Sequence, residues 1–398
     1  MIKLMRPLLQ AKTLTIIIVA IVVLGALGLV LFKRPLSSIV DGAPSCPKDK
    51  QIFTVSPMAL VDIKGIVPLG NLNPPGHTQP VEHMYLLTKL IKDPGEVGQP
   101  TEPVDAFAPG DIKVTTISQL EFLDKGYSDY SIGFTSCEGL SGSFIHLSAL
   151  SLVLQDALDD QKANDDVCET NKPGNETIKQ CWYDTNLTLK AGEKIGTVGG
   201  KSGSFGLDFS LNDNNQPPGY IANPERFRNL SAYNACGIDY FTAALTEQFY
   251  DKLGAEDGHK TADTTCGTAL QDLKGTAQGA WFKQGSPAKP QNENDSIALV
   301  HDNIDPTKPV FSISFPLESI GIKGGTYSFR SKSSGLIDRD FADITPDGNV
   351  YCFNAQGNSG PTVLLLALLD ETTLKVTLNK STDCSKVEPT EDSVTFIR

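Results

Sequence analysis

The sequence predicts a mostly β protein with an N-terminal transmembrane helix, a first domain built as a β-sandwich or barrel, and a second β-rich domain with one or two helices. Three observations lead to this class. The chain has 398 residues, which is more than one ordinary domain requires. Short runs rich in Val, Ile, Tyr and Phe, separated by Gly, Pro, Asn and Asp, recur from Ile63 to the end, as expected for many short strands. Residues 13–32 contain no charge.

The uncharged run 13–32 predicts a membrane span. As a helix it would be about 30 Å long, which matches the hydrocarbon core of a bilayer. Three basic residues precede it and two follow it, so we expect residues 1–12 in the cytoplasm, the lipid bilayer as a partner, and the rest of the chain outside the cell. The alternative is a cleaved signal peptide, but the run is longer than a usual h-region and lacks a small-x-small site behind it.

The remaining chain divides by composition. Residues 33–60 are rich in proline and predict a linker. Residues 61–215 form the first expected domain, with a helical turn at Leu150–Ala157. Its expected strands are Glu82–Leu87, Ile112–Ile117, Tyr130–Phe134, Ser143–Leu147, Lys194–Val198 and Leu207–Leu211.

A polar, proline-containing stretch at Asn212–Pro224 marks a boundary or a long connection. Residues 225–398 form the second expected domain. It begins with a helix at Tyr240–Leu253, where apolar residues recur at helical spacing. β-like runs follow at 297–301, 310–315, 325–329, 350–353, 363–368, 374–378 and 393–397.

The cysteines indicate an oxidising compartment. They are even in number, spread along residues 46–384, and never spaced as Cys-x-x-Cys, so disulfides are favoured over a zinc ribbon. Their separations favour three local pairs, which would leave a long-range fourth, although the sequence leaves the connectivity open. The expected pairs are Cys168–Cys181, Cys236–Cys266, Cys352–Cys384 and Cys46–Cys137.

Charge and motif spacing exclude several function classes. The net charge is −13, and no Lys/Arg cluster offers a surface for a phosphate backbone, so we expect no nucleic-acid partner. The run 196–204 contains Gly-Lys-Ser but lacks the spacing of a phosphate-binding loop. No Gly-x-Ser-x-Gly nucleophile elbow is present.

One series of motifs resembles a known family. The segments 104–117 and 129–134, the motif Phe144-Ile145-His146-Leu147, and the segments 192–200 and 205–211 follow one another in the order found in lysostaphin-like (LytM-type, duplicated hybrid motif) metallopeptidases. The resemblance covers about residues 76–213. It implies a β-rich domain with a zinc site made by a His-x-x-x-Asp strand and the second His of a His-x-His motif.

Carried over residue by residue, the resemblance implies a damaged site. His146 takes the position of an assisting, catalytic histidine. Gly206-Leu207-Asp208 stands where the family has His-x-His, so Asp208 offers a carboxylate oxygen in place of an imidazole. For the first motif, either His83 or His77 takes the ligand position, and the residue expected to be Asp is then Leu87 or Val81 respectively.

These substitutions lead to a non-catalytic hypothesis. We expect a membrane-anchored envelope protein whose degenerate domain acts as a binding or scaffold module for a cell-wall or peptide ligand, with no cofactor. The alternative is a membrane-tethered zinc endopeptidase that acts on cell-wall or peptide substrates and holds zinc through His83, His77 and Asp208. A purely structural surface protein is the third class.

Overall fold

The computed structural model describes residues 43–96, 98–161, 168–172, 176–200, 204–260, 265–290, 292–357 and 360–398. The predicted cytoplasmic tail 1–12, the predicted span 13–32 and the start of the linker lie outside this part of the chain. Within it, no helix combines the length and the apolar character needed to cross a bilayer.

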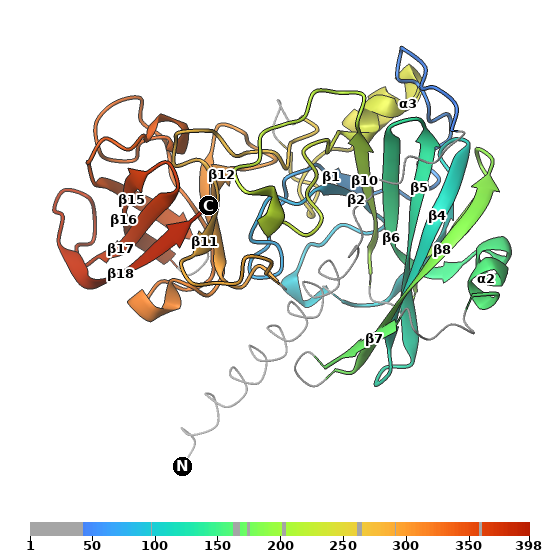
Figure 1. Cartoon of the computed structure of the whole chain (residues 1–398), viewed down its shortest axis with the longest axis horizontal. Helices are drawn as coiled ribbons and strands as arrows, with labels where there is room; N and C mark the ends of the chain where they lie inside the picture. Colours follow the sequence, from blue (N-terminus) through green and yellow to red (C-terminus); the bar gives the residue numbers. More distant parts are fainter. Residues whose placement is uncertain are drawn as a thin grey trace.

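A ten-stranded antiparallel sheet forms the first domain, and its strand order is not the order of the sequence (Figure 1). β3 (Thr101–Phe107) pairs with β9 (Lys194–Gly200), which continues onto β6. The main path runs through β1 (Gly65–Val67), β2 (His83–Leu87), β10 (Gly206–Asp213), β6 (Leu140–Leu150), β5 (Tyr127–Cys137), β4 (Ile112–Phe122), β8 (Ile178–Leu189) and β7 (Cys168–Asn171).

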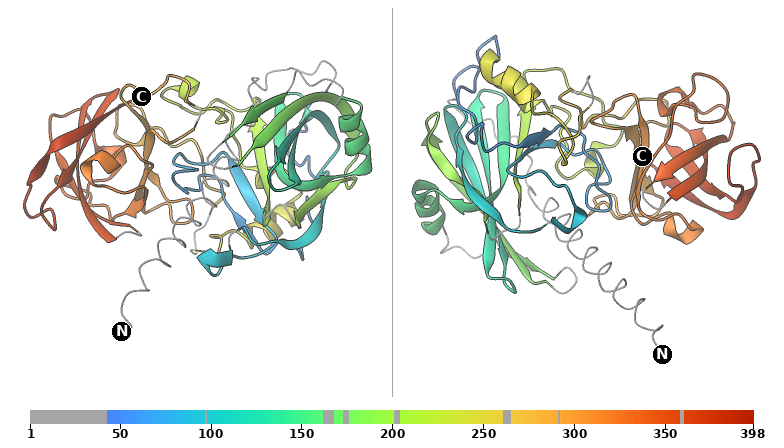
Figure 2. Two further views of the ribbon diagram at one scale, coloured as in Figure 1. Left: turned by 90° about the horizontal axis from the view of Figure 1, so that it is seen from below. Right: turned by 180° about the vertical axis from the view of Figure 1, so that it is seen from behind.

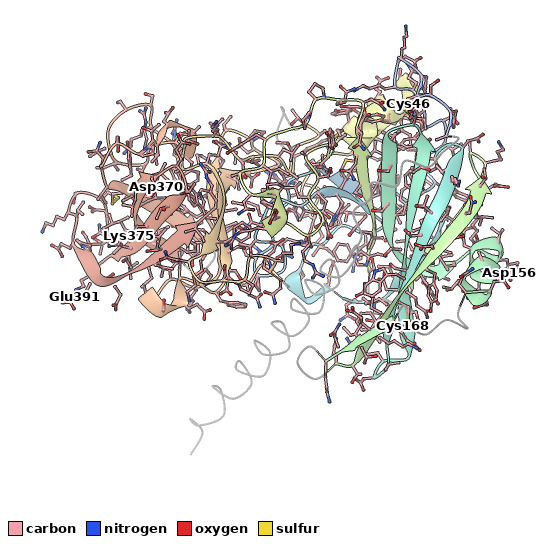
Figure 3. All side chains as sticks on the ribbon, viewed as in Figure 1. Cys46, Asp156, Cys168, Asp370, Lys375 and Glu391 are labelled. Atoms are coloured by element: carbon pink, nitrogen blue, oxygen red, sulfur yellow. A yellow bond between two sulfur atoms is a disulfide. The ribbon has the colours of Figure 1, made fainter. Side chains whose placement is uncertain are left out.

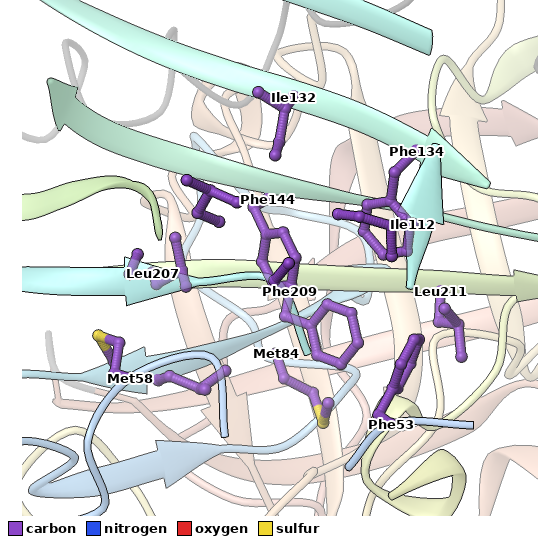
Figure 4. Close-up of a cluster of buried hydrophobic side chains, with 14 of the residues drawn as sticks. Phe53, Met58, Met84, Ile112, Ile132, Phe134, Phe144, Leu207, Phe209 and Leu211 are labelled. Atoms are coloured by element: carbon purple, nitrogen blue, oxygen red, sulfur yellow. The ribbon is translucent and has the colours of Figure 1, made fainter. Parts of the chain in front are cut away.

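Apolar residues alternate along β10, and their side chains form part of the hydrophobic core on one face of the sheet. Leu207, Phe209 and Leu211 are completely or almost completely buried, because side chains two residues apart point to the same face of a strand. The Phe209 ring stacks on Phe144 at 5.0 Å and meets Phe53 edge-on at 6.1 Å. Figure 4 shows these rings converging with Phe134, Met84 and Ile112.

The helices of this region are short. α2 (Leu152–Asp159) follows β6, where a helical turn is expected. α3 (Ala243–Tyr250) is shorter than the predicted helix 240–253, because a 3₁₀ turn, Gly237–Tyr240, precedes it. Other 3₁₀ turns lie at Pro94–Glu96, Pro224–Arg226, Glu318–Ile320 and Phe341–Asp343.

Residues just beyond the expected boundary pack into the first core. Phe241 and Phe249 belong to the same buried cluster as Phe53 and Phe209, and the two rings meet edge-on at 4.8 Å. The helical segment that the sequence grouped with the second domain, 225–398, therefore contributes to the packing of the first.

The second domain is a closed eight-stranded barrel. It closes where β11 pairs with β18, with Phe282 opposite Ile397. Trp281 and several phenylalanines fill its interior. Its strands are β11 (Gly279–Lys283), β12 (Ser296–His301), β13 (Pro309–Ile313), β14 (Gly325–Ser328), β15 (Tyr351–Gly357), β16 (Gly360–Asp370), β17 (Thr373–Asn379) and β18 (Pro389–Ile397).

Four disulfides confirm the expected pairing. They join Cys46 to Cys137, Cys168 to Cys181, Cys236 to Cys266 and Cys352 to Cys384. Figure 3 labels Cys46 and Cys168 at opposite ends of the first domain. Such a complement of bridges is typical of an oxidising, extracellular environment.

The sheet and the barrel lie at the two ends of the molecule, and the segment that joins them runs between them (Figures 1 and 2). Direct hydrogen bonds hold the junction. The Asn303 side-chain amide donates to the Pro68 carbonyl at 2.9 Å, and the backbone N–H of Gln79 donates to the Glu293 carboxylate at 2.7 Å. These contacts bring the loop before β2 against the barrel.

Candidate functional site

A row of ionisable side chains crosses four neighbouring strands of the sheet, on the face opposite the aromatic core. It consists of His83 on β2, Asp208 on β10, His146 on β6 and Asp129 on β5. Asp208 lies between the core residues Leu207 and Phe209, so alternation directs its carboxylate away from the core. His83 stands opposite Ser210 in the register, which places it on the same face as Asp208.

His146 reaches this face through an unusual backbone conformation. Phe144 points into the core, so regular alternation would direct His146 the same way. Its φ is instead 71°, in the left-handed region that a residue other than glycine seldom adopts. At this point β6 leaves β10, and its pairing continues with β9 from Leu147 onward. The break in pairing turns the imidazole onto the polar face, and such local strain is concentrated at functional sites.

The row is joined by short contacts. Nδ1 of His146 hydrogen-bonds Oδ2 of Asp129 at 2.8 Å. Oδ2 of Asp208 lies 3.3 Å from Nε2 of His146 and 3.2 Å from Nε2 of His83. The second of these is an ion pair without hydrogen-bond geometry, since Nε2 of His83 is a buried nitrogen with no hydrogen-bond partner. One carboxylate oxygen of Asp208 therefore lies within ion-pair distance of two imidazoles.

Burial and mutual charge determine the protonation of the cluster. Burial alone would lower the pKa of His83, but the adjacent Asp208 carboxylate outweighs it and raises the pKa to about 10. The pKa of His146 likewise rises well above its ordinary value, because Asp129 and Asp208 outweigh burial. Burial would raise the pKa of Asp208, but the two histidines hold it well below its usual range. The cluster is thus an alternating chain of charges.

Two residues before β2 complete the cluster. The His77 ring meets the His83 ring edge-on, with centroids 5.7 Å apart. Burial, followed by repulsion from His83, lowers the pKa of His77 to about 4, so it is neutral at pH 7. Oε1 of Glu82 lies 3.4 Å from Nδ1 of His83.

The contact of Glu82 corrects a sequence-based expectation. In the predicted strand Glu82–Leu87, alternation would direct the Glu82 side chain to the face opposite His83. β2 begins only at His83, so Glu82 lies in the preceding loop and its carboxylate turns toward the imidazole.

The structure brings the four residues chosen from the sequence, His77, His83, His146 and Asp208, into one cluster. Their role as ligands or catalysts stays a prediction. Sequence reasoning missed Asp129, although a signal was present. Asp129 opens the segment 129–134 of the motif series, and the structure shows its carboxylate to be 5% exposed, where a charged group requires a partner of opposite charge.

The cluster meets the needs of a cation site only in part. Two imidazoles and a carboxylate are suitable zinc donors, and Nε2 of His83 has no hydrogen bond. However, no group of three or more His, Cys, Asp or Glu side chains is placed to hold a metal ion anywhere in the described ranges. The positions that the family resemblance assigns to a ligand carboxylate, Leu87 or Val81, are apolar.

A pocket opens beside the cluster, at the junction of the two domains. His77 and Glu82 line it, and both contact His83. Its empty volume is about 590 Å³, a figure that includes open solvent. The connecting segment and the barrel supply the other walls, which include Arg226, Phe227, Phe282 and Glu293.

Glu293 in this pocket predicts a pH dependence of stability. Burial, with a smaller contribution from Glu82, raises its pKa from 4.5 to about 8. Folding therefore favours the protonated carboxyl, and the stability that it contributes is complete below pH 4.5 and is lost as the pH rises through about 8. Wild-type protein should lose about 2 kcal/mol more unfolding free energy between pH 5 and pH 7 than Glu293→Gln.

Urea unfolding at both pH values measures this difference. The matched control is Glu391→Gln, at an exposed glutamate of β18, which should retain the wild-type pH profile. A Glu293→Gln profile parallel to that of the wild type would contradict the expectation.

No protein-family model matches the chain, and no curated protein matches it. Among solved structures, the NMR structure of lysostaphin is a neighbour that covers 86% of this chain and 90% of that chain, with 11% sequence identity and a TM-score of 0.24. At that TM-score the likeness carries no argument about fold or function, so the resemblance to LytM-type peptidases remains one of motifs.

Proposed function

We propose that the chain is a non-catalytic binding module of an extracytoplasmic envelope protein, and that the first domain and the junction pocket bind an extended peptide or a cell-wall peptide. The observation that carries the proposal is the way the cluster is connected. Asp208 is shared between His83 and His146, and Asp129 and Glu82 engage the outer nitrogens. The groups that a metallohydrolase would use thus neutralise one another.

The surroundings support a binding role. The pocket beside the cluster has walls from the loop before β2, from the connecting segment and from the barrel, and clefts between domains are common binding sites. We extend the proposal to a membrane anchor at residues 13–32, with the folded part outside the cell. The four disulfides support the extracellular side of this topology.

One observation favours a second candidate, a zinc endopeptidase. Ligand atoms about 2.0–2.1 Å from a tetrahedral zinc ion lie about 3.3 Å from one another. The separations of Asp208 Oδ2 from the two imidazole nitrogens are 3.2 and 3.3 Å. A cation that displaced the histidine protons would find two of its ligand pairs already at the required spacing.

Zinc analysis and binding assays on the full chain distinguish the two candidate functions. After dialysis against zinc and removal of excess metal, the protein is analysed for bound zinc and incubated with purified peptidoglycan and with N-acetyl-trialanine amide. A binding module should sediment with peptidoglycan or bind the peptide, leave both intact and hold less than stoichiometric zinc. Stoichiometric zinc that is lost in His83→Ala, together with cleavage, would establish the enzyme. Absence of binding to either probe would leave a structural surface protein.

A further inference from the structure

Arg226 occupies a position that a charged side chain seldom takes. It is the last residue of the 3₁₀ turn Pro224–Arg226 and is only 8% exposed. It lines the junction pocket. Among the residues that the structure describes, its guanidinium forms no ion pair, that is, no carboxylate oxygen lies within 4.0 Å of its nitrogens. A buried charge is costly unless it is paired, so this arrangement leaves a strong donor group without a partner of opposite charge.

The guanidinium is nevertheless held in place. Nη1 donates to the Ser286 hydroxyl at 3.1 Å, and the guanidinium lies 5.0 Å from the centre of the Phe282 ring. The Phe227 ring meets Phe282 edge-on at 5.7 Å. A guanidinium has five N–H donors, so most of its donors remain available in a group whose orientation is already determined.

The two acidic residues that line the pocket, Glu82 and Glu293, contact groups other than Arg226. Glu82 contacts Nδ1 of His83 at 3.4 Å, and Glu293 accepts the backbone N–H of Gln79 at 2.7 Å. Burial also raises the pKa of Glu293, so this carboxyl is mostly uncharged at pH 7 and does not repel an anion. Arg226 therefore presents an oriented guanidinium against the Phe282 ring, while both acids of the lining have other partners. Arg228 is a second basic residue of the lining.

We propose that Arg226 is a carboxylate-binding subsite, at which the guanidinium takes a carboxylate of the bound peptide while Phe227 and Phe282 contact the adjoining apolar atoms. The planar guanidinium fork matches a carboxylate with two parallel hydrogen bonds. The inference rests on the proposed function in taking the ligand to be a peptide. The carboxylate comes either from the end of the chain or from an acidic side chain.

Calorimetric titration of the full chain tests this subsite with N-acetyl-trialanine, its amide, and N-acetyl-Ala-Glu-Ala amide. The free acid should bind about tenfold more tightly than the amide, because a charge-assisted hydrogen-bonded pair contributes about 1.4 kcal/mol or more. If a side-chain carboxylate is the ligand, the glutamate peptide shows the gain instead. Arg226→Gln should remove the preference, and Arg226→Lys should retain only part of it.

Arg330→Gln is the matched control, because it removes an exposed arginine of the barrel and should keep the preference. Equal affinity for all three peptides, or a carboxylate preference that survives in Arg226→Gln, overturns the subsite. If the amide binds in that case, the proposed peptide-binding function still stands. If no peptide binds, the proposed function fails. A titration with succinate, a free dicarboxylate, then tests the carboxylate subsite by itself. Succinate that binds the wild type and not Arg226→Gln supports it, and any other result rejects it.

Discussion

Asp208→Asn is expected to lower the free energy of unfolding by about 3–5 kcal/mol, which is the usual cost of removing one partner from a buried ion pair. Asp208 is 4% exposed, and its Oδ2 is the shared partner of His83 and His146. Asparagine has nearly the same shape, so the loss reports charge rather than packing. Both imidazoles would then lose one of the carboxylates that raise their pKa values in a buried place.

The measurement is urea unfolding of the purified chain, with Asp105→Asn as the matched control. Asp105 also forms an ion pair, with Lys194 at 2.6 Å, but its side chain is 53% exposed. Exposed pairs contribute about 0–1 kcal/mol, so this variant should unfold near the wild type. A double-mutant cycle with His146→Gln should show coupling between the two sites. An Asp208→Asn protein as stable as the control would show that the cluster is not an ion-paired chain.

Removal of the Cys46–Cys137 bridge is expected to cost about 4.6 kcal/mol, and removal of Cys168–Cys181 about 2.9 kcal/mol, in the chain-entropy account of disulfides. The first bridge spans 91 residues and the second spans 13. The longer bridge restricts the unfolded chain more, and it also ties the segment before β1 to the end of β5.

Two double alanine variants, one for each bridge, make the comparison direct. Each bridge has one buried and one partly buried cysteine, so the packing that is lost is similar and the difference reports loop length. Chemical unfolding under non-reducing conditions measures both variants. Equal losses, or a larger loss for the short bridge, would contradict the expected order.

Local pattern was enough to predict several elements of this fold. The alternation in 207–211 predicts a strand with one apolar face, and β10 has that face in the core. The strands β3 and β8 were missed for a shared reason. β3 contains Pro103 and does not alternate between apolar and polar residues, and β8 carries charged and amide side chains among its apolar ones. Pairing with neighbouring strands, which no local pattern records, makes these segments extended.

The candidate site was likewise predicted in part from local motifs and determined in part by tertiary contacts. The order of motifs predicted that His77, His83, His146 and Asp208 belong together, and they do lie in one cluster. No local pattern indicates that Arg226 lines a pocket, because its surroundings come from distant segments. Gln79 and Glu293, for example, are 214 residues apart in the chain.

The amino-acid sequence by itself determined the mostly β class, the preference for disulfides and the identity of the histidines and carboxylates, because these follow from side-chain chemistry and from alternation over a few residues. Only the tertiary structure decided that Asp208 joins two imidazoles. That contact requires β10 to lie between β2 and β6, and it requires the left-handed backbone at His146 to reverse the face that alternation assigns. Both depend on which distant strands pair.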